Sequence, residues 1–509
     1  MKANQLKVGA IMSYLLIGLG SIISILYTPI MLRLLGQSEY GLYNLVSSVV
    51  SYLGLLSFGF GSAYIKYFSK YRVNKEFENI AKLNGMFLTI FSVMGFVSII
   101  AGVILVFNTE NIFGSQLSIR ELEIAKILMA IMVVNIAISF PAIVFNSFVA
   151  ANEKFIFQRS LQIIKVVTSP FLILPVLMMG YASIGMAIAT TVINFLVEFV
   201  NAFYCFKKID INFSFKKFDS GLMRELFIFS SFIFMNLVVN QINWNVDRYI
   251  IGRFKGTVAV ATYSLAAQLN TYYLSFSTAL SGVYIPRVNA MVSGENDNNE
   301  LSMLFARLGR LQFILLSLII SGLIFFGIAF IRIWAGKDYD ESYSIALMLI
   351  IPVTLPLLQN LGIEIQRAKN MHKFRSWVYL FIAIGNVFIS IPLVKLYGGI
   401  GAAAGTAIAL VIGNVFVMNW YYHKKVGLNI KMFITQILKI SPALVIPSIT
   451  GMLMYYYLNL FDVKILIVSI VFYTIIFSIS MWFMGMNKYE KNLIINPYYK
   501  IKSKLFRNI

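Results

Sequence analysis

The chain has 509 residues, of which 59% are hydrophobic and 12% are charged, and its formal net charge at pH 7 is +21. This composition excludes an ordinary soluble domain. The basic balance does not indicate nucleic-acid binding, because Lys and Arg lie mainly in alternate short connectors, as the positive-inside rule expects of a membrane protein. A single cysteine, Cys205, excludes an internal disulfide framework. No cluster of Cys, His and carboxylates has metal-site spacing.

Apolar stretches of about 20 to 25 residues recur along the chain, and a bilayer core about 30 Å thick needs about 20 helical residues. Because a backbone in lipid must satisfy its own hydrogen bonds, we predict an all-α polytopic membrane protein. The first stretch is too long for a signal-peptide core and is expected to stay in the mature protein. The fourteen predicted spans are 8–32, 41–65, 83–107, 127–150, 161–182, 183–206, 226–250, 257–285, 311–334, 343–367, 377–396, 399–422, 433–458 and 461–485.

The distribution of cations predicts the orientation of these spans. With the N-terminus inside, the inner connectors and tails hold about 30 Lys and Arg residues and the outer ones about 10, while Lys165 and Lys439 fall within spans. An even number of spans then places both termini in the cytoplasm. One outer connector breaks the trend, with Arg248, Arg253 and Lys255. No connector is long enough for a folded domain outside the membrane.

The chain also contains an internal repeat. Residues 34–45, LLGQSEYGLYNL, resemble 250–265, with Gly36 matched to Gly252 at an offset of 216 and Tyr43 matched to Tyr263 at 220 after four extra residues. Residues 184–190, IGMAIAT, match 400–406, IGAAAGT, at 216 again. Because this offset holds six spans, the repeats share one orientation. We therefore predict two pseudo-symmetric six-helix lobes, 1–215 and 216–430, and a third part, 431–509, with two appended helices and a basic cytoplasmic tail.

This layout, with LLGQSEYGLYNL after the first span, resembles the Wzx-type polysaccharide flippases for O-antigen or capsule repeat units. They belong to the superfamily, called MOP, that also contains MATE exporters and the lipid II flippase MurJ. The resemblance implies an alternating-access transporter whose cargo is an undecaprenyl-diphosphate-linked oligosaccharide. The first span has no arginine before Arg33, where MurJ carries essential arginines, so lipid II is a less favoured cargo.

The span 226–250 is the most polar. Asn236, Asn240, Asn243 and Asp247 follow i, i+4, i+7 and i+11 spacing and therefore share one helical face. A stripe of amides facing lipid would leave donors unsatisfied, so the face must meet protein or a wet cavity. Amides donate to and accept from hydroxyls, which favours a sugar-binding wall. The alternative is hydrogen bonding between helices.

Charges within spans are costly and are therefore functional candidates. Lys165 and Glu198 lie on adjacent spans, where they form either a structural ion pair or, if unpaired, a diphosphate attractor and a proton carrier. Glu364 is a further candidate for ion coupling. Its spacing from Arg367 also suits a local helical pair solvated at the interface.

Asp247 is the strongest candidate for H⁺ or Na⁺ coupling, because protonation or cation binding would remove a costly charge. A structural salt bridge with a neighbouring arginine is the alternative. Arg33, Lys66, Arg248 and Arg253 are candidates for contacts with the diphosphate, since arginine suits bidentate phosphate binding. As residues near span ends, they are also typical snorkelling anchors.

Together these features predict a flippase in the bacterial plasma membrane, coupled to a H⁺ or Na⁺ gradient and without a cofactor. Membrane lipids, a polysaccharide polymerase and glycosyltransferases are its expected partners. The alternative is an exporter of small organic cations, as MATE proteins are. Few acidic residues accompany the amides within the spans, and this favours a sugar cargo over a cation. An enzyme is disfavoured, because acid–base chemistry on sugars needs paired carboxylates or a sizeable aqueous loop.

Overall fold

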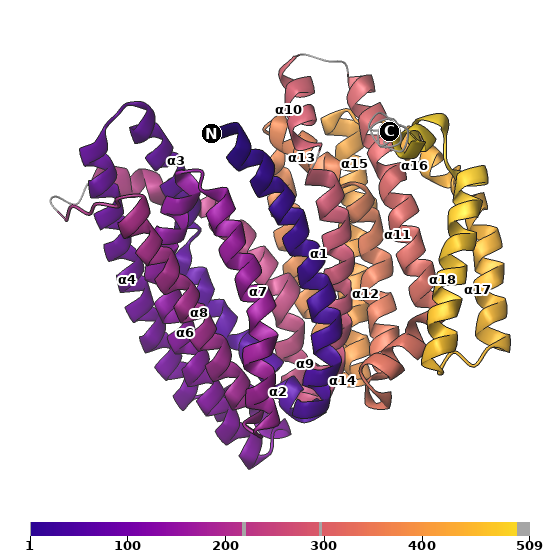
Figure 1. Cartoon of the computed structure of the whole chain (residues 1–509), viewed down its shortest axis with the longest axis horizontal. Helices are drawn as coiled ribbons and strands as arrows, with labels where there is room; N and C mark the ends of the chain where they lie inside the picture. Colours follow the sequence, from indigo (N-terminus) through magenta and orange to yellow (C-terminus); the bar gives the residue numbers. More distant parts are fainter. Residues whose placement is uncertain (1, 216–219, 283, 295–297, 496–509) are drawn as a thin grey trace, which may run out of the picture. The chain divides into compact units, whose positions relative to one another are not determined.

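The computed structural model describes residues 2–215, 220–282, 284–294 and 298–495, and every regular element in these stretches is helical (Figure 1). The α-helices up to the middle of the chain are α1 (Lys2–Leu35), α2 (Gln37–Val50), α3 (Phe60–Val73), α4 (Phe77–Phe107), α5 (Thr109–Phe113), α6 (Ile119–Ala151), α7 (Phe155–Met178), α8 (Ala182–Lys208) and α9 (Ser220–Gly282). They are followed by α10 (Ile285–Ser293), α11 (Asn298–Trp334), α12 (Glu341–Leu358), α13 (Asn360–Ala368), α14 (His372–Leu410), α15 (Asn419–Tyr421), α16 (Ile430–Leu438), α17 (Val445–Tyr457) and α18 (Val463–Ser480).

Within these described residues, twelve helical segments are long and apolar enough to cross a bilayer. This finding confirms an all-helical, multi-pass membrane protein, but the number differs from the fourteen predicted spans. The difference arises in two segments of 58 and 54 residues, each of which contains two predicted spans. A straight helix of 58 residues would be about 87 Å long at 1.5 Å per residue, nearly three times a bilayer core. Both segments are instead broken once, at Gly256 and at Gly398.

The breaks recur along the chain at nearly constant spacing. Gly36 has φ 74° and ψ 166°, and Gly256, 220 residues later, has φ 79° and ψ −174°. These are backbone conformations that only glycine adopts without strain. Further residues with positive φ also pair at offsets of 216 to 222, namely Gly114 with Gly336, Glu153 with Asn370, Ala182 with Gly398, and Asp210 with Gly427. The internal repeat is therefore present in the backbone as well as in the sequence.

The structure corrects one match within the repeat. Gly252, which the sequence pattern paired with Gly36, lies inside a regular helical stretch of α9, where an added Cβ would meet the side chain of Leu45 at 2.3 Å. Gly256 is the structural counterpart of Gly36, and the offset of 220 then runs unchanged to Tyr43 and Tyr263. The sequence match was wrong because Gly252 and Gly256 both lie near the helix break. The amino-acid sequence alone does not show which of the two glycines has a positive φ.

The two repeat-related segments pack directly on each other. A Cβ added to Gly41 would lie 1.8 Å from the carbonyl oxygen of Thr257, so the backbones approach closely at this glycine. The Glu121 carboxylate accepts hydrogen bonds from the hydroxyls of Ser38 and Thr257, both at 2.7 Å, and from the backbone N–H of Ser118 at 2.8 Å. One acidic side chain at the start of α6 thereby connects the first turns that follow both glycine breaks.

The chain divides into two compact units. The first comprises Met1–Ser264 and Ala383–Gly405, and the second comprises Leu265–Ile382 and Thr406–Ile509. The core of the first unit is a cluster of aromatic rings from α3, α4 and α6 that includes Phe60, Tyr64, Phe87 and Phe140. Such packing gives the helices a fixed arrangement where lipid supplies no hydrophobic driving force between them.

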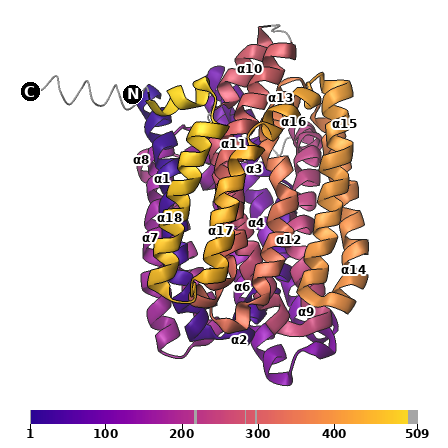
Figure 2. The ribbon, with the colours of Figure 1, turned by 90° about the vertical axis from the view of Figure 1, so that its right-hand side faces the viewer.

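In the second unit, α17 and α18 run side by side and pack against α11 (Figures 1 and 2). A buried ion pair holds the segment that follows α18 against α11. Arg310 of α11 and Glu490 are 4% and 2% exposed, with Nε–Oε1 at 2.6 Å and Nη2–Oε2 at 2.9 Å. The same guanidinium donates to the carbonyl oxygens of Gln436 and Gly485, both at 2.8 Å. Three separate parts of the second unit therefore meet at one arginine.

Removing one partner of this pair is expected to destabilise the protein strongly. Arg310→Ala would leave the Glu490 carboxylate buried without its counter-charge, at a cost of about 3–5 kcal/mol. Arg367→Ala is the matched control, because that side chain is 66% exposed and its pair with Glu364 is a surface pair worth about 1 kcal/mol or less. Thermal unfolding of the purified variants in detergent measures both effects, and equal midpoints for the two variants would contradict the assigned role of Arg310.

Candidate functional site

The predicted amide stripe lies on α9, which is helical throughout residues 236–247, so the predicted shared face is confirmed. Asn236 and Asn240 are exposed, Asn243 is half-buried, and Asp247 is only 1% exposed. The neighbouring Gln241 hydrogen-bonds the hydroxyl of Ser51, which fixes α9 against the helical turn that follows α2. The stripe thus runs from an exposed end to a buried carboxylate.

Asp247 is held by a tyrosine at the start of the second half of α9. Its Oδ2 accepts a hydrogen bond of 2.6 Å from the hydroxyl of Tyr263, which is 4% exposed. The positions 220 residues earlier are Tyr27 and Tyr43. The second repeat therefore carries a carboxylate where the first carries a phenol, and this substitution makes Asp247 a feature of one repeat only.

The four cationic residues predicted near the span ends all lie in the first unit. Arg33 is exposed in the last turn of α1. The Lys66 ammonium lies 4.1 Å from the centre of the Phe229 ring, a cation–π contact between α3 and α9. Arg248 donates to the side chain of Asn245 at 3.3 Å, and Arg253 donates to the carbonyl oxygens at the end of α5, residues 111 and 112, at 2.6 and 2.7 Å. Arg253 therefore has a structural role in this conformation.

Lys165 and Glu198 line one polar cavity of about 300 Å³ between α6, α7 and α8 of the first unit. Among the ion pairs within 4.0 Å in the part of the chain that the structure describes, this pair does not occur. Glu198 instead accepts a hydrogen bond of 2.8 Å from Asn146, which in turn accepts one of 2.9 Å from Asn201. The two charges therefore form no direct ion pair in this conformation, and their functional roles stay a prediction. Both groups face a shared pocket.

Glu364 lies on α13 and pairs with Arg367 at 2.8 Å. This contact confirms the local helical pair that the spacing predicted. The Arg367 side chain is largely exposed, as expected of a pair solvated at a helix end. Of the three carboxylates considered for ion coupling, Glu364 forms an ion pair with Arg367, Asp247 accepts from the Tyr263 hydroxyl and Glu198 accepts from the Asn146 amide.

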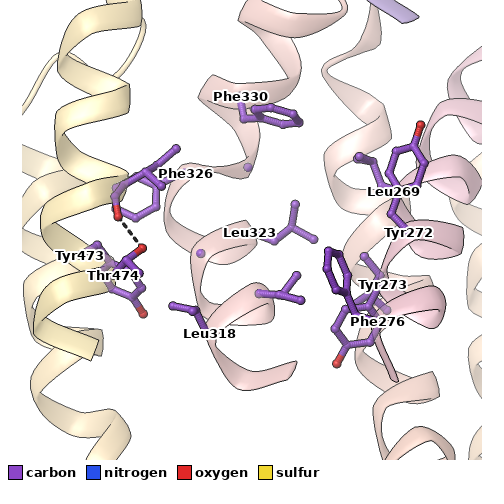
Figure 3. Close-up of a pocket in the computed structure, with 15 residues that line it drawn as sticks. Leu269, Tyr272, Tyr273, Phe276, Leu318, Leu323, Phe326, Phe330, Tyr473 and Thr474 are labelled. Carbon is purple, nitrogen blue, oxygen red and sulfur yellow. Dashed lines mark hydrogen bonds between the residues drawn. The ribbon is translucent and has the colours of Figure 1, made fainter. Parts of the chain in front are cut away.

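A second cavity, of about 310 Å³, lies wholly within the second unit and is almost entirely apolar. The lining side chains come from α9, α11, α12 and α18, and those labelled in Figure 3 include Leu269, Tyr272, Tyr273 and Phe276 of α9, Leu318, Leu323, Phe326 and Phe330 of α11, and Tyr473 of α18. Sequence reasoning missed this cavity, because apolar residues in a membrane span give no signal that separates a pocket lining from a lipid-facing surface. It also missed the polar residues around Lys165, although Asn135 and Asn194 are amides within predicted spans.

Comparison with known proteins identifies the family. A model of the family described as "Polysaccharide biosynthesis protein" matches residues 6–292, more than half of the chain. The chain belongs to the polysaccharide biosynthesis protein family. This confirms the resemblance that the repeat and the spans indicated.

Two curated proteins are similar to this chain in sequence. A protein of Shigella flexneri described as "Putative O-antigen transporter" is 24% identical over 403 residues, which cover 77% of this chain and 91% of the relative. The teichuronic acid biosynthesis protein TuaB of Bacillus subtilis is 23% identical over 227 residues, which cover 44% of this chain and 45% of the relative.

Solved structures show the same fold at low sequence identity. The lipid II flippase MurJ in an inward closed conformation has a TM-score of 0.68 at 18% identity, covering 93% of this chain and 97% of that one. An inward-facing MATE family transporter of the MOP superfamily has a TM-score of 0.62 at 13% identity, covering 79% and 94%. The chain therefore has the fold of MurJ and of this MATE family transporter.

Proposed function

We propose that this protein is a flippase that moves an undecaprenyl-diphosphate-linked oligosaccharide from the inner to the outer leaflet of a bacterial plasma membrane by alternating access. The observation that carries the proposal is the similarity to the Shigella flexneri protein described as "Putative O-antigen transporter", across 91% of that relative's length. A family named for polysaccharide biosynthesis and the fold shared with a lipid II flippase support the same cargo class.

The two cavities supply the two kinds of surface that such a cargo needs. The cavity in the first unit presents charged and amide side chains, which suit hydroxyl-rich sugars. The cavity in the second unit is lined by aliphatic and aromatic side chains, which suit a polyprenyl chain. An exporter of small organic cations, the alternative that the MATE-like fold suggests, would make little use of the exposed amides Asn236 and Asn240.

The topology in this proposal has fourteen spans, because the glycine breaks at Gly256 and Gly398 each separate two membrane crossings. Both termini lie in the cytoplasm, as the distribution of Lys and Arg predicts. The lobes are residues 1–215 and 216–430, which the recurring positive-φ residues support, and 431–509 adds the helix pair and the tail. Glycosyltransferases that build the repeat unit and a polymerase that consumes it are the expected protein partners.

Within the lobes, Asn236, Asn240 and Asn243 form the sugar-binding wall of α9, and the diphosphate is attracted by Arg33, Lys66, Lys165, Arg248 and Arg253. Asp247 couples transport to a H⁺ or Na⁺ gradient, with Glu198 and Glu364 as the other candidate carboxylates. The buried position of Asp247 supports this assignment, since a carboxylate out of water gains most from a proton or cation.

Loss of the protein tests the cargo assignment. Cells in which its gene is deleted should accumulate carrier-linked repeat units on the cytoplasmic face, because the charged, hydroxyl-rich head group cannot cross the bilayer core unaided. Mass spectrometry of extracted lipids, combined with an impermeant glycosidase applied from either side of membrane vesicles, measures the amount and the sidedness. Restoration by a plasmid copy is the control. Unchanged outward transfer in the deletion strain would refute the flippase assignment.

Asp247→Asn tests the coupling residue. Asparagine keeps an oxygen that accepts from Tyr263 but cannot take up a proton or neutralise a cation, so transport should lose its dependence on the ion gradient while the protein still inserts. Flipping in proteoliposomes with and without an imposed gradient gives the readout. Glu78→Gln is the matched control, because that carboxylate is 82% exposed. Gradient dependence that survives Asp247→Asn would eliminate this residue.

A further inference from the structure

We propose that the polar cavity between α6, α7 and α8 is a subsite for a single uncharged sugar ring of the cargo, and that the diphosphate binds elsewhere. This inference rests on the proposed flippase function and makes its substrate recognition specific. It also revises the expectation that Lys165 attracts the diphosphate. Six polar residues line the cavity, namely Asn135, Ser139, Lys165, Thr191, Asn194 and Glu198.

The size of the cavity favours one ring. Its volume of about 300 Å³ lies at the lower end of the range of about 300–1,000 Å³ that small-ligand pockets occupy. A chain of several sugars would need more room. Ile136, Ile138 and Phe195 also line the cavity, so that one wall can contact the C–H face of a sugar while the polar residues meet its hydroxyls.

The charges of the lining favour an uncharged ligand. Lys165 carries a formal positive charge and Glu198 a formal negative charge, so the formal charges of the lining cancel. A diphosphate entering this cavity would gain one ammonium but would also meet a carboxylate of like charge, which repels it. Hydroxyl groups both donate and accept, and one ring can therefore bridge the ammonium and the carboxylate without adding charge.

The hydrogen-bonding groups of the cavity complement such a ring. Asn194 donates to Asn135 at 3.2 Å, and within the described residues its buried Oδ1 atom has no hydrogen-bond partner. The hydroxyls of Ser139 and Thr191 donate to backbone carbonyls of their own helices, at 2.7 and 2.8 Å, which leaves their oxygens as acceptors. Lys165 supplies up to three donors opposite these acceptors.

The cavity must also contain water when no sugar is bound. All six polar side chains lie within helices long and apolar enough to span the membrane. A lipid-filled cavity would leave an ammonium, a carboxylate and an amide oxygen without solvation, which is strongly unfavourable. A wet cavity inside a span makes a chemical test possible, because a thiol reacts with polar reagents only where water allows the thiolate to form.

Cysteine labelling tests the subsite directly. In a Cys205→Ala background, Thr191→Cys places a thiol in the cavity, and Val192→Cys, one residue away at an exposed apolar position, is the matched control. The purified protein in nanodiscs is treated with a small impermeant methanethiosulfonate reagent. We expect the cavity cysteine to react about tenfold or more faster than the control. Glucose or N-acetylglucosamine should slow this reaction, whereas inorganic pyrophosphate at matched ionic strength should not.

Two results would overturn the proposal. Equal, slow labelling of both cysteines would show that the cavity is dry, and protection by pyrophosphate without protection by the sugars would assign the cavity to the diphosphate. Ser139→Cys, with Val134→Cys as its exposed apolar control, repeats the test on α6 if Thr191→Cys does not fold. The labelling needs no transport, so its outcome is independent of the deletion experiment, and failure of the flippase assignment would be recognised separately.

Discussion

A helical backbone in the core of a bilayer has no water with which to replace its own hydrogen bonds, and this constraint governs the rest of the structure. A sharp turn between two helices therefore favours a residue that tolerates positive φ, above all glycine. Three such turns fall at Gly36, Gly256 and Gly398. Because Gly36 and Gly256 share nearly the same φ and ψ, the two repeats turn in the same way and bring their next helices together at Gly41 and Thr257.

The same scarcity of water leaves few ways to keep a charge buried within or beside a span. Arg310 and Glu490, the latter beyond the last span, show one way, in which a bidentate pair with additional carbonyl acceptors satisfies both buried charges. Lys165 and Glu198 show the other, in which the charges stay apart and line a polar cavity. The first arrangement secures a fixed part of the protein, and the second keeps hydrogen-bonding capacity available for a ligand. Their contrast distinguishes structural charges from candidate functional ones better than position within a span does.

Much of the architecture was predictable, because hydropathy is a local property and the bilayer imposes a length. Each predicted span overlaps one of the twelve segments in the described residues that are long and apolar enough to cross a bilayer, and the two pairs of spans merged within α9 and α14 are separated at a glycine close to the predicted boundary. The repeat was found, but its alignment at Gly252 was wrong, since backbone conformation and not residue type identifies Gly256 as the equivalent of Gly36.

The candidate site was predicted less well. The shared face of the amide stripe follows from helical periodicity, whereas the partners of each polar group depend on other helices.

The sequence by itself determined the all-helical membrane class, the repeat and the set of polar groups within spans, because each of these follows from composition and from spacing along one helix. The tertiary structure alone decided that Tyr263 holds Asp247, that Arg253 binds backbone carbonyls near residue 112, and that Asn135 and Asn194 join Lys165 and Glu198 around one cavity. These contacts join residues that are 16 to 141 positions apart in the chain or that lie on different helices. Helix packing, which arises from side-chain shape over whole surfaces, brings them together, and no local pattern records it.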